Sequence, residues 1–387
     1  MDRVTHFEYA HSAQQVVFGV GVVDRLGEFG ERYHWPRLLL CTSGSSQRSG
    51  HVARIQAALG ARLVAIYDRV QPHVPDYQVA EVLVLAEEYE IDAIIGLGGG
   101  SPIGMAKAIS LALEAKRVGN PVDAALPTDQ PLIPVIAIPT TYAGSEMTPV
   151  YGVTQHDNGA ARKVTVTNPR VTPKLALYDP QLTLSLPPDM TASTGINALA
   201  HCIEAVYSIT RNPLSTAAAL SGAREIAQAL PLCFSQGDDV QARTQMLVGS
   251  YLAGTALSNV AMGLHHGICH VLGGTAGVAH GIANSIMLPH VMRFNLNATA
   301  SELAAIGEAM GLARTGRSDF TVAEAAAQRV HDLVREMKLP QQLRLVGVSE
   351  NDLPRLAQLA LTSRTIKNNP KPITDAAQIE SVLRAAW

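Results

Sequence analysis

The stretch Asp92–Ser110, "DAIIGLGGGSPIGMAKAIS", carries the clearest fold signal in the chain. It begins as a short apolar run, passes through three consecutive glycines, and continues with the spacing of an amphipathic helix. A short apolar run that ends in glycines is typical of a buried strand, because strands buried on both faces are apolar throughout. The stretch therefore predicts a strand, a tight glycine loop and a helix in succession.

Similar strand and helix patterns alternate on both sides of this stretch. Helical periodicity marks Ala80–Glu90. The other predicted strands are Arg37–Ser43, Ala61–Asp68, Pro131–Thr141 and Pro173–Asp179. Short apolar strands that alternate with amphipathic helices indicate a doubly wound parallel sheet. We assign this α/β dinucleotide-binding domain to residues 1–186.

The remainder of the chain has a different pattern. After "SLPPDM" (Ser185–Met190) strand signals disappear, and the segments that follow carry helical spacing. We therefore expect an all-helical domain over residues 187–387. A chain of 387 residues is also too long for one hydrophobic core. A cleft between the two domains is where we expect a ligand to bind.

Two polar loops are candidates for cofactor binding. Gly98, Gly99, Gly100 and Ser101 precede the predicted helix, whose amino end would offer free N–H groups to a pyrophosphate. The spacing is neither GxGxxG nor a Walker A motif, so a tight turn that merely needs glycine is the alternative. Thr140, Thr141 and Ser145 follow a strand end, where hydroxyl groups could bind a ribose or a nicotinamide amide, or form an ordinary polar turn.

Histidines cluster in the second half of the chain. His265, His266, His270, His280 and His290 lie within "HHGICHVLGGTAGVAHGIANSIMLPH". Upstream, Asn197 and His201 stand four residues apart, on one face of a predicted helix. Neutral imidazole suits zinc or iron, although a single buried histidine is more often a hydrogen-bonded core residue. So many histidines beside glycines favour a functional site, with or without a metal.

The composition excludes several classes of protein. With 30 Lys and Arg against 33 Asp and Glu, the net charge of −3 indicates neither a nucleic-acid partner nor a membrane surface. The first residues lack the apolar core of a signal peptide, and no apolar run reaches the ~20 residues that span a bilayer. The four cysteines are scattered and include no CxxC pair, which is typical of reduced thiols. We expect a cytoplasmic enzyme.

Five ordered motifs resemble those of the iron-containing (group III) alcohol dehydrogenase family. They are "GGGSPIGMAK", "PTTYAGSEMTP", "TGINALAHCIE", "MGLHHGICHVLGG" and "AHGIANSIMLPHVMRFN", followed by "NNPKPIT" near the C-terminus. The resemblance covers essentially the whole chain. It implies an N-terminal dinucleotide-binding α/β domain, a C-terminal all-helical domain and a homodimer. It also places Asn197, His201, His266 and His280 at the family's metal-ligand positions, with His270 close by.

Two departures resemble the maleylacetate reductase branch of that family. Metal-dependent members carry an aspartate where this chain has Asn197, and their glycine motif, GGGSxxDxxK, has an aspartate where this chain has Gly104. The branch reduces maleylacetate to 3-oxoadipate with NADH or NADPH during aromatic-compound degradation, and is not regarded as metal-dependent. The resemblance therefore implies no required metal, with at most a weak site at His201, His266 and His280.

Two further positions bear on the cofactor. Ser43 stands where many relatives carry an aspartate that would bind the adenosine ribose and repel a 2′-phosphate. Serine does neither strongly, so we expect NADPH to be tolerated as well as NADH. Lys163 aligns with a family lysine near the nicotinamide ribose and is assigned to the cofactor. Arg162, Lys163 and Lys367 are the candidates for binding substrate carboxylates, and the sequence does not choose among them.

The chemistry expected of the branch fits these residues. Hydride addition to the carbon β to a ketone yields an enolate, which fixed hydrogen-bond donors can stabilise without a metal. The candidate donors and acids are Asn197, His201, His266, His270 and His280. Maleylacetate is a dianion, so an asparagine in the site avoids the repulsion that an aspartate would cause.

Three alternatives remain open at this point. A metal-dependent alcohol dehydrogenase or aldehyde reductase of the same family would retain a three-histidine site. A lyase of the related dehydroquinate-synthase-like fold would need an acidic metal ligand, and Asn197 counts against it. A non-catalytic nucleotide-binding protein would not need the histidine cluster.

Overall fold

The computed structural model describes residues 7, 9, 13–119, 133–157 and 160–387. The chain forms two compact units, one within residues 11–185 and one that contains residues 186–387. The predicted domain limits, 1–186 and 187–387, stay a prediction, because compactness alone does not show that each part folds independently. Each unit is described by itself below. Within the described ranges, no helix is long and apolar enough to cross a membrane.

The first unit is built on a six-stranded sheet in which every neighbouring pair is parallel, as the sequence predicts. The strand order is β1-β8-β5-β4-β2-β3. The strands are β1 (Gln15–Phe18), β2 (Leu38–Cys41), β3 (Leu63–Tyr67), β4 (Ala93–Gly98), β5 (Val135–Pro139) and β8 (Leu175–Tyr178). β3 lies beside β2 on one side of the sheet, whereas β5 lies beside β4 on the other side. The direction in which strands are added therefore reverses between β2 and β4.

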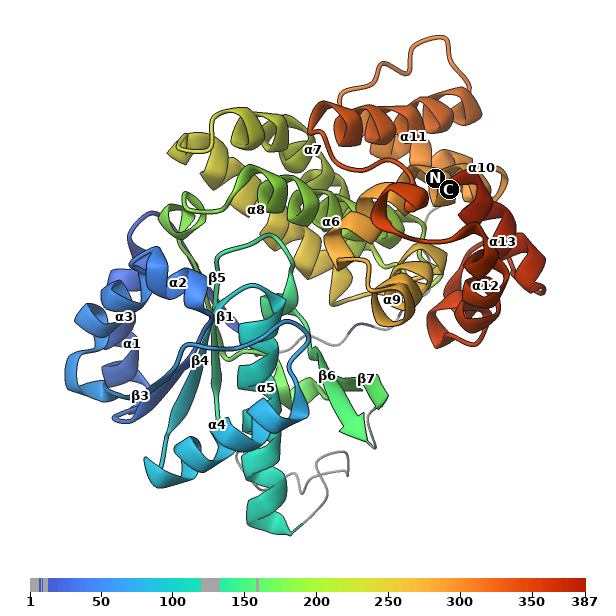
Figure 1. The fold of residues 1–387 in the computed structure, drawn as a ribbon. Coiled ribbons are helices and arrows are strands. Elements are labelled where there is room, and N and C mark those ends of the chain that lie inside the picture. The colour runs from blue at the N-terminus through green and yellow to red at the C-terminus, as the bar shows by residue number, and fades with distance from the viewer. Residues whose placement is uncertain (1–6, 8, 10–12, 120–132, 158–159) are drawn as a thin grey trace. The chain divides into compact units, whose positions relative to one another are not determined.

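Helices cover both faces of this sheet (Figure 1). The helices of this unit are α1 (Leu26–Arg32), α2 (Gly44–Arg48), α3 (His51–Leu59), α4 (Asp76–Glu88) and α5 (Gly100–Val118). Leu38 and Leu40 of β2 share a core with α1 and α3. Leu39 and Cys41 of the same strand share a second core with α4 and α5. Because alternate side chains point to opposite faces, a strand buried on both faces is apolar throughout.

A two-stranded antiparallel sheet, β6 (Val150–Asp157) with β7 (Ala160–Thr167), stands apart from the parallel sheet. Neither this pair nor β1 follows from the sequence reading above. β6 consists of three apolar residues and a glycine followed by four polar residues, and only the second half of β7 alternates polar with apolar residues. The pattern of such a pair is too weak to distinguish from a long polar loop.

The second unit is helical throughout its described length, as expected. Its helices are α6 (Pro188–Tyr207), α7 (Pro213–Ser235), α8 (Val240–Leu257), α9 (Leu264–Ala276), α10 (His280–Ala309), α11 (Asp319–Glu336), α12 (Leu353–Leu361) and α13 (Ala376–Ala385). α6 is buried along almost its whole length. α9, α10, α12 and α13 share one apolar core. A buried central helix gives rigid support to any polar side chain that it carries.

Candidate active site

The glycine loop lies where the strand order of the sheet reverses. It follows β4, which pairs with β2 on one side and β5 on the other. In open parallel sheets, this position outside the carboxyl ends of the strands is where nucleotides bind. Gly98 has a φ of 138°, which a residue with a side chain rarely adopts. A Cβ on Gly96 would lie only 2.6 Å from Ile103 Cα, so glycine also allows α5 to pack directly on β4.

Gly100 differs from these glycines because it faces open space. Apart from its chain neighbours and the adjoining backbone of α5, no atom of the described residues lies within 4 Å of the position that a Cβ on Gly100 would occupy. Gly100 is also the first residue of α5, a helix of 19 residues, so its surroundings combine open space with free N–H groups. Such a cradle fits the pyrophosphate of a dinucleotide.

Replacing Gly100 by alanine tests this assignment. We expect G100A to unfold at the same denaturant concentration as the wild type or slightly above it, because alanine favours helix and no protein atom is displaced. We expect its Kd for NADH, measured by fluorescence titration, to rise about tenfold or more because the methyl group occupies the phosphate position. An unchanged Kd would place the pyrophosphate elsewhere.

The second polar loop adjoins the first at the neighbouring strand end. The Thr140 N–H donates to the Gly98 carbonyl over 3.0 Å. The Thr141 side chain packs on the glycine loop, with its Oγ1 3.2 Å from the position of a Cβ on Gly99. The structure therefore brings Thr140 and Thr141 beside the glycine loop, and the binding of cofactor by either loop stays a prediction.

Lys107 of α5 holds this second loop in place. Its Nζ donates to the carbonyl oxygens of Ser145 at 2.5 Å, Thr148 at 2.8 Å and Val150 at 3.0 Å. The lysine is fully buried. Burial lowers the pKa of Lys107 to about 7, against the attraction of Glu146. Ser145 thus contributes a carbonyl to the support of the loop, and its predicted contact with cofactor stays a prediction.

The remaining predicted cofactor residues lie at two places. Ser43 follows β2, whose end is tied to β4 because Thr42 Oγ1 donates to the Leu97 carbonyl at 2.8 Å. The Oγ of Ser101 accepts a hydrogen bond from the His73 N–H at 3.1 Å. That bond does not use the hydroxyl proton of Ser101. Lys163 and Arg162 fall among the β7 residues whose side chains lie outside the described part of the structure. Their assignments stay predictions.

The predicted histidine cluster forms in the helical unit. α6 contributes Asn197 and His201, α9 contributes His266 and His270, and α10 begins at His280. The imidazole of His266 is stacked on that of His201 with ring centroids 4.8 Å apart, and its centroid is 5.9 Å from that of His280. The rings of His270 and His280 are stacked with centroids 5.7 Å apart. The structure therefore brings the four histidines to one place, and Asn197 lies one helical turn before His201 on α6.

His290 does not belong to this cluster. It lies further along α10, where burial and the positive charges of Arg293 and His331 lower its pKa to about 4. His265 is not one of these five residues, and it is completely buried. Its Nε2 is 3.2 Å from the Asn284 carbonyl, which is typical of a hydrogen-bonded core histidine.

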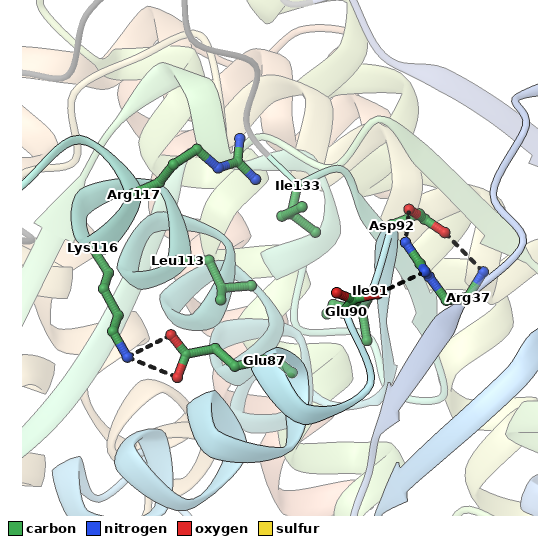
Figure 2. Close-up of a pocket in the computed structure, with 10 residues that line it drawn as sticks. Arg37, Glu87, Glu90, Ile91, Asp92, Leu113, Lys116, Arg117 and Ile133 are labelled. Carbon is green, nitrogen blue, oxygen red and sulfur yellow. Dashed lines mark hydrogen bonds and ion pairs between the residues drawn. The ribbon is translucent and has the colours of Figure 1, made fainter.

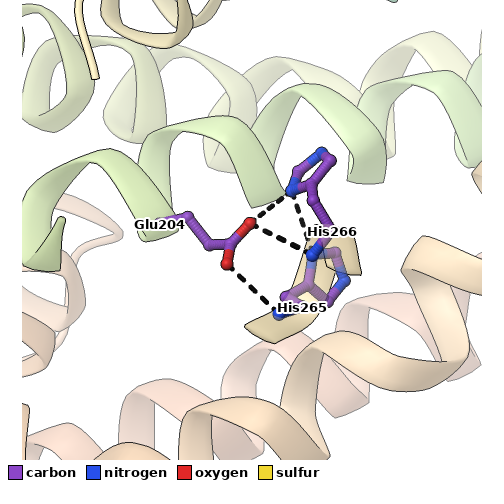
Figure 3. Close-up of side chains that lie close together, drawn as sticks. All are labelled: Glu204, His265 and His266. Carbon is purple, nitrogen blue, oxygen red and sulfur yellow. Dashed lines mark hydrogen bonds and ion pairs between the residues drawn. The ribbon is translucent and has the colours of Figure 1, made fainter. Parts of the chain in front are cut away.

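Glu204 is a member of the cluster that the sequence reading missed. Its carboxylate points from α6 toward the imidazoles of His265 and His266 on α9 (Figure 3). Oε2 of Glu204 is hydrogen-bonded to Nδ1 of His266. Glu204 follows Asn197 by seven residues and His201 by three, so helical periodicity places all three on one face. That spacing was the available signal.

The charges of this cluster are set by burial and by Glu204. Burial acts to raise the pKa of Glu204. The charge of His266, together with hydrogen bonds from His265 and His266, outweighs burial, so the pKa of Glu204 is lowered overall. Burial lowers the pKa of His266 although Glu204 opposes this. Burial and the neighbouring His266 also lower the pKa of His201. Burial also acts to lower the pKa of His265, but Cys269 and Glu204 outweigh it and raise the pKa to about 10. The cluster therefore holds the Glu204 carboxylate beside two imidazoles, those of His201 and His266, whose neutral forms are favoured.

Three buried polar atoms of the cluster have no hydrogen-bond partner among the described residues. They are Asn197 Oδ1, His201 Nδ1 and His266 Nε2. Buried polar groups are normally paired, so unpaired ones that gather in one place indicate that something else binds there.

A pocket of about 450 Å³ lies elsewhere, at the amino ends of the parallel strands (Figure 2). Arg37 and Asp92, which precede β2 and β4, form an ion pair across it at 3.3 Å. Lys116 and Glu87 form another at 2.5 Å. Because these charges pair with each other and the nucleotide edge of the sheet is the opposite one, this pocket is not the candidate active site.

Comparison with known proteins decides the family. The profile of "Iron-containing alcohol dehydrogenase" matches residues 13–180, and that of "Fe-containing alcohol dehydrogenase family, C-terminal" matches residues 191–387. The chain belongs to the iron-containing alcohol dehydrogenase family. It is therefore an oxidoreductase, and the resemblance predicted from its motifs is confirmed.

Relatives within the iron-containing alcohol dehydrogenase family match along the whole chain. Maleylacetate reductase 1 of Cupriavidus pinatubonensis is 34% identical over 386 residues, which cover 98% of this chain and 97% of the relative. A solved maleylacetate reductase from Agrobacterium tumefaciens is 31% identical, with 99% of both chains covered and a TM-score of 0.83. A solved 1,3-propanediol oxidoreductase is 32% identical, with 99% of this chain and 100% of that one covered and a TM-score of 0.92.

The family's metal raises the question of whether these residues fit one. The unpaired atoms of Asn197, His201 and His266 could face a cation, but all three belong to neutral groups. The ligand atoms of Glu204, His265 and His266 also lie within 4.8 Å of one another. Glu204, however, is hydrogen-bonded directly to His266, which leaves no space for an ion that needs about 2 Å to each ligand. The site therefore offers imidazole nitrogens, which suit zinc or iron, but a neutral amide at position 197 and a Glu204 carboxylate that is already bound to His266.

Proposed function

We propose that this protein reduces the carbon–carbon double bond of maleylacetate to give 3-oxoadipate, with NADH or NADPH and without a required metal. The observation that carries the proposal is Asn197. It places a neutral amide, 5% exposed and with an unpaired oxygen, at the position where metal-dependent relatives carry an aspartate. The similarity to maleylacetate reductases over nearly the whole chain supports the same activity.

The proposed reaction requires the cluster to stabilise an enolate. When bound, NAD(P)H supplies the hydride, which adds to the carbon β to the ketone and shifts negative charge onto the ketone oxygen. The Asn197 side-chain amide can donate a hydrogen bond to that oxygen from a site that excludes water. A bound dianion also raises the pKa of nearby imidazoles, so they can carry protons that they lack in the free enzyme.

Histidines of the cluster then complete the reaction. We assign the protonation of the adjacent carbon to a histidine of the cluster or to water that it orients. His270 is exposed and His280 half-buried, so either can exchange protons with solvent. His201 and His266 are buried beside Asn197 and help to exclude water from the reacting atoms.

Positive groups should hold the two substrate carboxylates. Of the three candidates, Lys367 is the one whose side chain the structure describes in the same unit as the histidines. It is exposed on a short 3-10 helix, Arg364–Asn368. That helix contacts α9, since Thr365 and Ile366 pack on Gly267, the residue after His266. We therefore assign a substrate carboxylate to Lys367.

The cofactor is assigned from the first unit. Gly98, Gly99, Gly100 and Ser101 would hold the pyrophosphate, and Thr140 and Thr141 lie beside them. Ser43 carries no charge to repel a 2′-phosphate, so both NADH and NADPH should serve. As the resemblance implies, we further propose that the protein acts as a cytoplasmic homodimer in the degradation of aromatic compounds.

A substrate comparison tests the proposed activity. The purified protein should oxidise NADH or NADPH in the presence of maleylacetate, with formation of 3-oxoadipate as the stoichiometric product. Simple alcohols with NAD⁺, and simple aldehydes with NADH, should give kcat/KM values lower by about 100-fold or more, since they offer neither carboxylates nor an enone. Faster turnover of simple alcohols than of maleylacetate would refute the assignment.

One observation favours a second candidate, a metal-dependent alcohol dehydrogenase or aldehyde reductase of the same family. The lone pairs of His201 Nδ1 and His266 Nε2 are unpaired in the described structure, as those of metal ligands would be before binding. This candidate requires a cation at a site whose first ligand position is neutral. We rank it second for that reason.

A further inference from the structure

Glu204 is a buried carboxylate to which the proposed reaction assigns no role. It is 1% exposed and lies against the amino end of α9. Its Oε1 accepts the N–H groups of Gly263 at 3.1 Å and His265 at 3.2 Å, and its Oε2 accepts that of His266 at 3.3 Å. A carboxylate that accepts three backbone N–H groups is held in its ionised form, because a proton would displace one of these bonds.

This arrangement fixes where the proton of His266 resides. Oε2 of Glu204 is hydrogen-bonded to Nδ1 of His266, and an ionised carboxylate has no proton to donate. The proton of that bond therefore belongs to Nδ1. The other ring nitrogen, Nε2, is buried without a partner among the described residues.

The neighbouring histidine is held through its other ring nitrogen. Nε2 of His265 lies 3.2 Å from the Asn284 carbonyl, which can only accept, so His265 carries its proton on Nε2. Its Nδ1 lies 3.4 Å from Nδ1 of His266. The two adjacent imidazoles are thus fixed through different nitrogens, His265 through Nε2 by Asn284 and His266 through Nδ1 by Glu204.

We propose that Glu204 is a positioning residue that fixes His266 with its proton on Nδ1, so that His266 acts on the substrate only through Nε2. Glu204 performs two tasks with one carboxylate. It caps the amino end of α9, which sets the position of His266, and it binds the ring, which sets its orientation and tautomer.

The consequence for catalysis rests on the proposed function. When Nε2 also carries a proton, His266 is an imidazolium held against the Glu204 carboxylate. Transfer of that proton to the enolate carbon forms a C–H bond and breaks the Nε2–H bond, which leaves neutral His266 with Nδ1–H still bound to Glu204. A proton from solvent, passed on by His270 or His280, then restores the proton on Nε2. Glu204 stays ionised throughout and touches neither substrate nor cofactor.

Histidine nitrogen NMR of the full-length protein tests the positioning directly. In protein labelled with ¹⁵N-histidine, the neutral His266 signal, identified by its loss in His266→Gln, should show a protonated Nδ1 and an unprotonated Nε2. Glu204→Gln should reverse that pattern, because its amide NH₂ can donate to Nδ1. With maleylacetate, E204Q should lower kcat about 10- to 100-fold while the Kd for NADH stays unchanged.

Glu302→Gln is the matched control. Glu302 is also buried and in the helical unit, but its partner is Arg211 rather than a histidine, so E302Q should leave the His266 signals and kcat unchanged. A wild-type His266 protonated on Nε2 when neutral, or an E204Q enzyme with wild-type kcat, would overturn the proposal. If E204Q does not fold, the wild-type spectrum alone decides. Absence of maleylacetate reduction by the wild type would overturn the proposed function but not the tautomer assignment.

Discussion

The N197D enzyme should lose about 100-fold or more in kcat/KM for maleylacetate, with a nearly unchanged Kd for NADH. Asn197 is 5% exposed, so a carboxylate there would be poorly screened by water. Two like charges about 5 Å apart repel by about 3 kcal/mol at an effective dielectric constant of about 20. The substrate carries two negative charges, and the variant also loses the amide donor that we assign to the enolate oxygen.

N197A separates these two contributions. It removes the donor without adding a charge, and loss of one hydrogen bond to a charged group costs about 1.5–3 kcal/mol. The alanine enzyme should therefore be impaired, but less than N197D. N197D should in addition bind Zn²⁺ more tightly than the wild type in an equilibrium titration, because it restores an anionic ligand. If N197D and N197A have equal kcat/KM, repulsion of the dianion is not the reason for the amide.

The K107M variant should be less stable than the wild type by about 3–5 kcal/mol, as is usual when one partner of a buried charge arrangement is removed. The three carbonyl groups of Ser145, Thr148 and Val150 would lose the donor that they share. Glu146, which is buried and whose pKa is raised by burial, would also lose the attraction of the nearby cation. Urea unfolding followed by circular dichroism measures the loss.

Lys116 offers a matched control on the same helix. It is exposed and paired with Glu87, so K116M should change stability by less than about 1 kcal/mol. K107M that remains folded should also bind NADH more weakly than K116M, because the loop that it anchors lies beside the glycine loop. Equal stability of the two variants would mean that the buried lysine contributes no more than a surface ion pair.

The parallel sheet was predictable because burial on both faces leaves a simple sequence pattern. Leu38–Cys41 and Ala93–Gly98 are continuous apolar runs, and both form the predicted strands. β1 is a short run that begins with glutamine, β6 ends in four polar residues and β7 alternates only in its second half, so composition did not distinguish these strands from loops. Their existence depends on pairing partners far away in sequence, which local patterns do not encode.

The candidate site was predictable to the extent that one helix face defines it. Asn197 and His201 follow from their spacing, and His266 and His270 follow in the same way. Glu204 was missed although it shares that face, because a glutamate near a helix end is usually exposed. What buries it is the approach of α9, whose amino-terminal N–H groups it accepts. His290 was grouped with the cluster because it is close in sequence. It lies ten residues after His280 on α10, which places it outside the cluster.

The central claim is that the histidine cluster, with neutral Asn197 at the position of an aspartate, reduces maleylacetate without a metal. The most direct measurement follows NADH oxidation with maleylacetate after exhaustive chelation, with the metal content of the same sample determined by mass spectrometry. We predict undiminished kcat and KM in protein that holds less than one-tenth of an equivalent of iron or zinc. Loss of activity on chelation that is restored by added iron or zinc would contradict the account and favour the metal-dependent alternative.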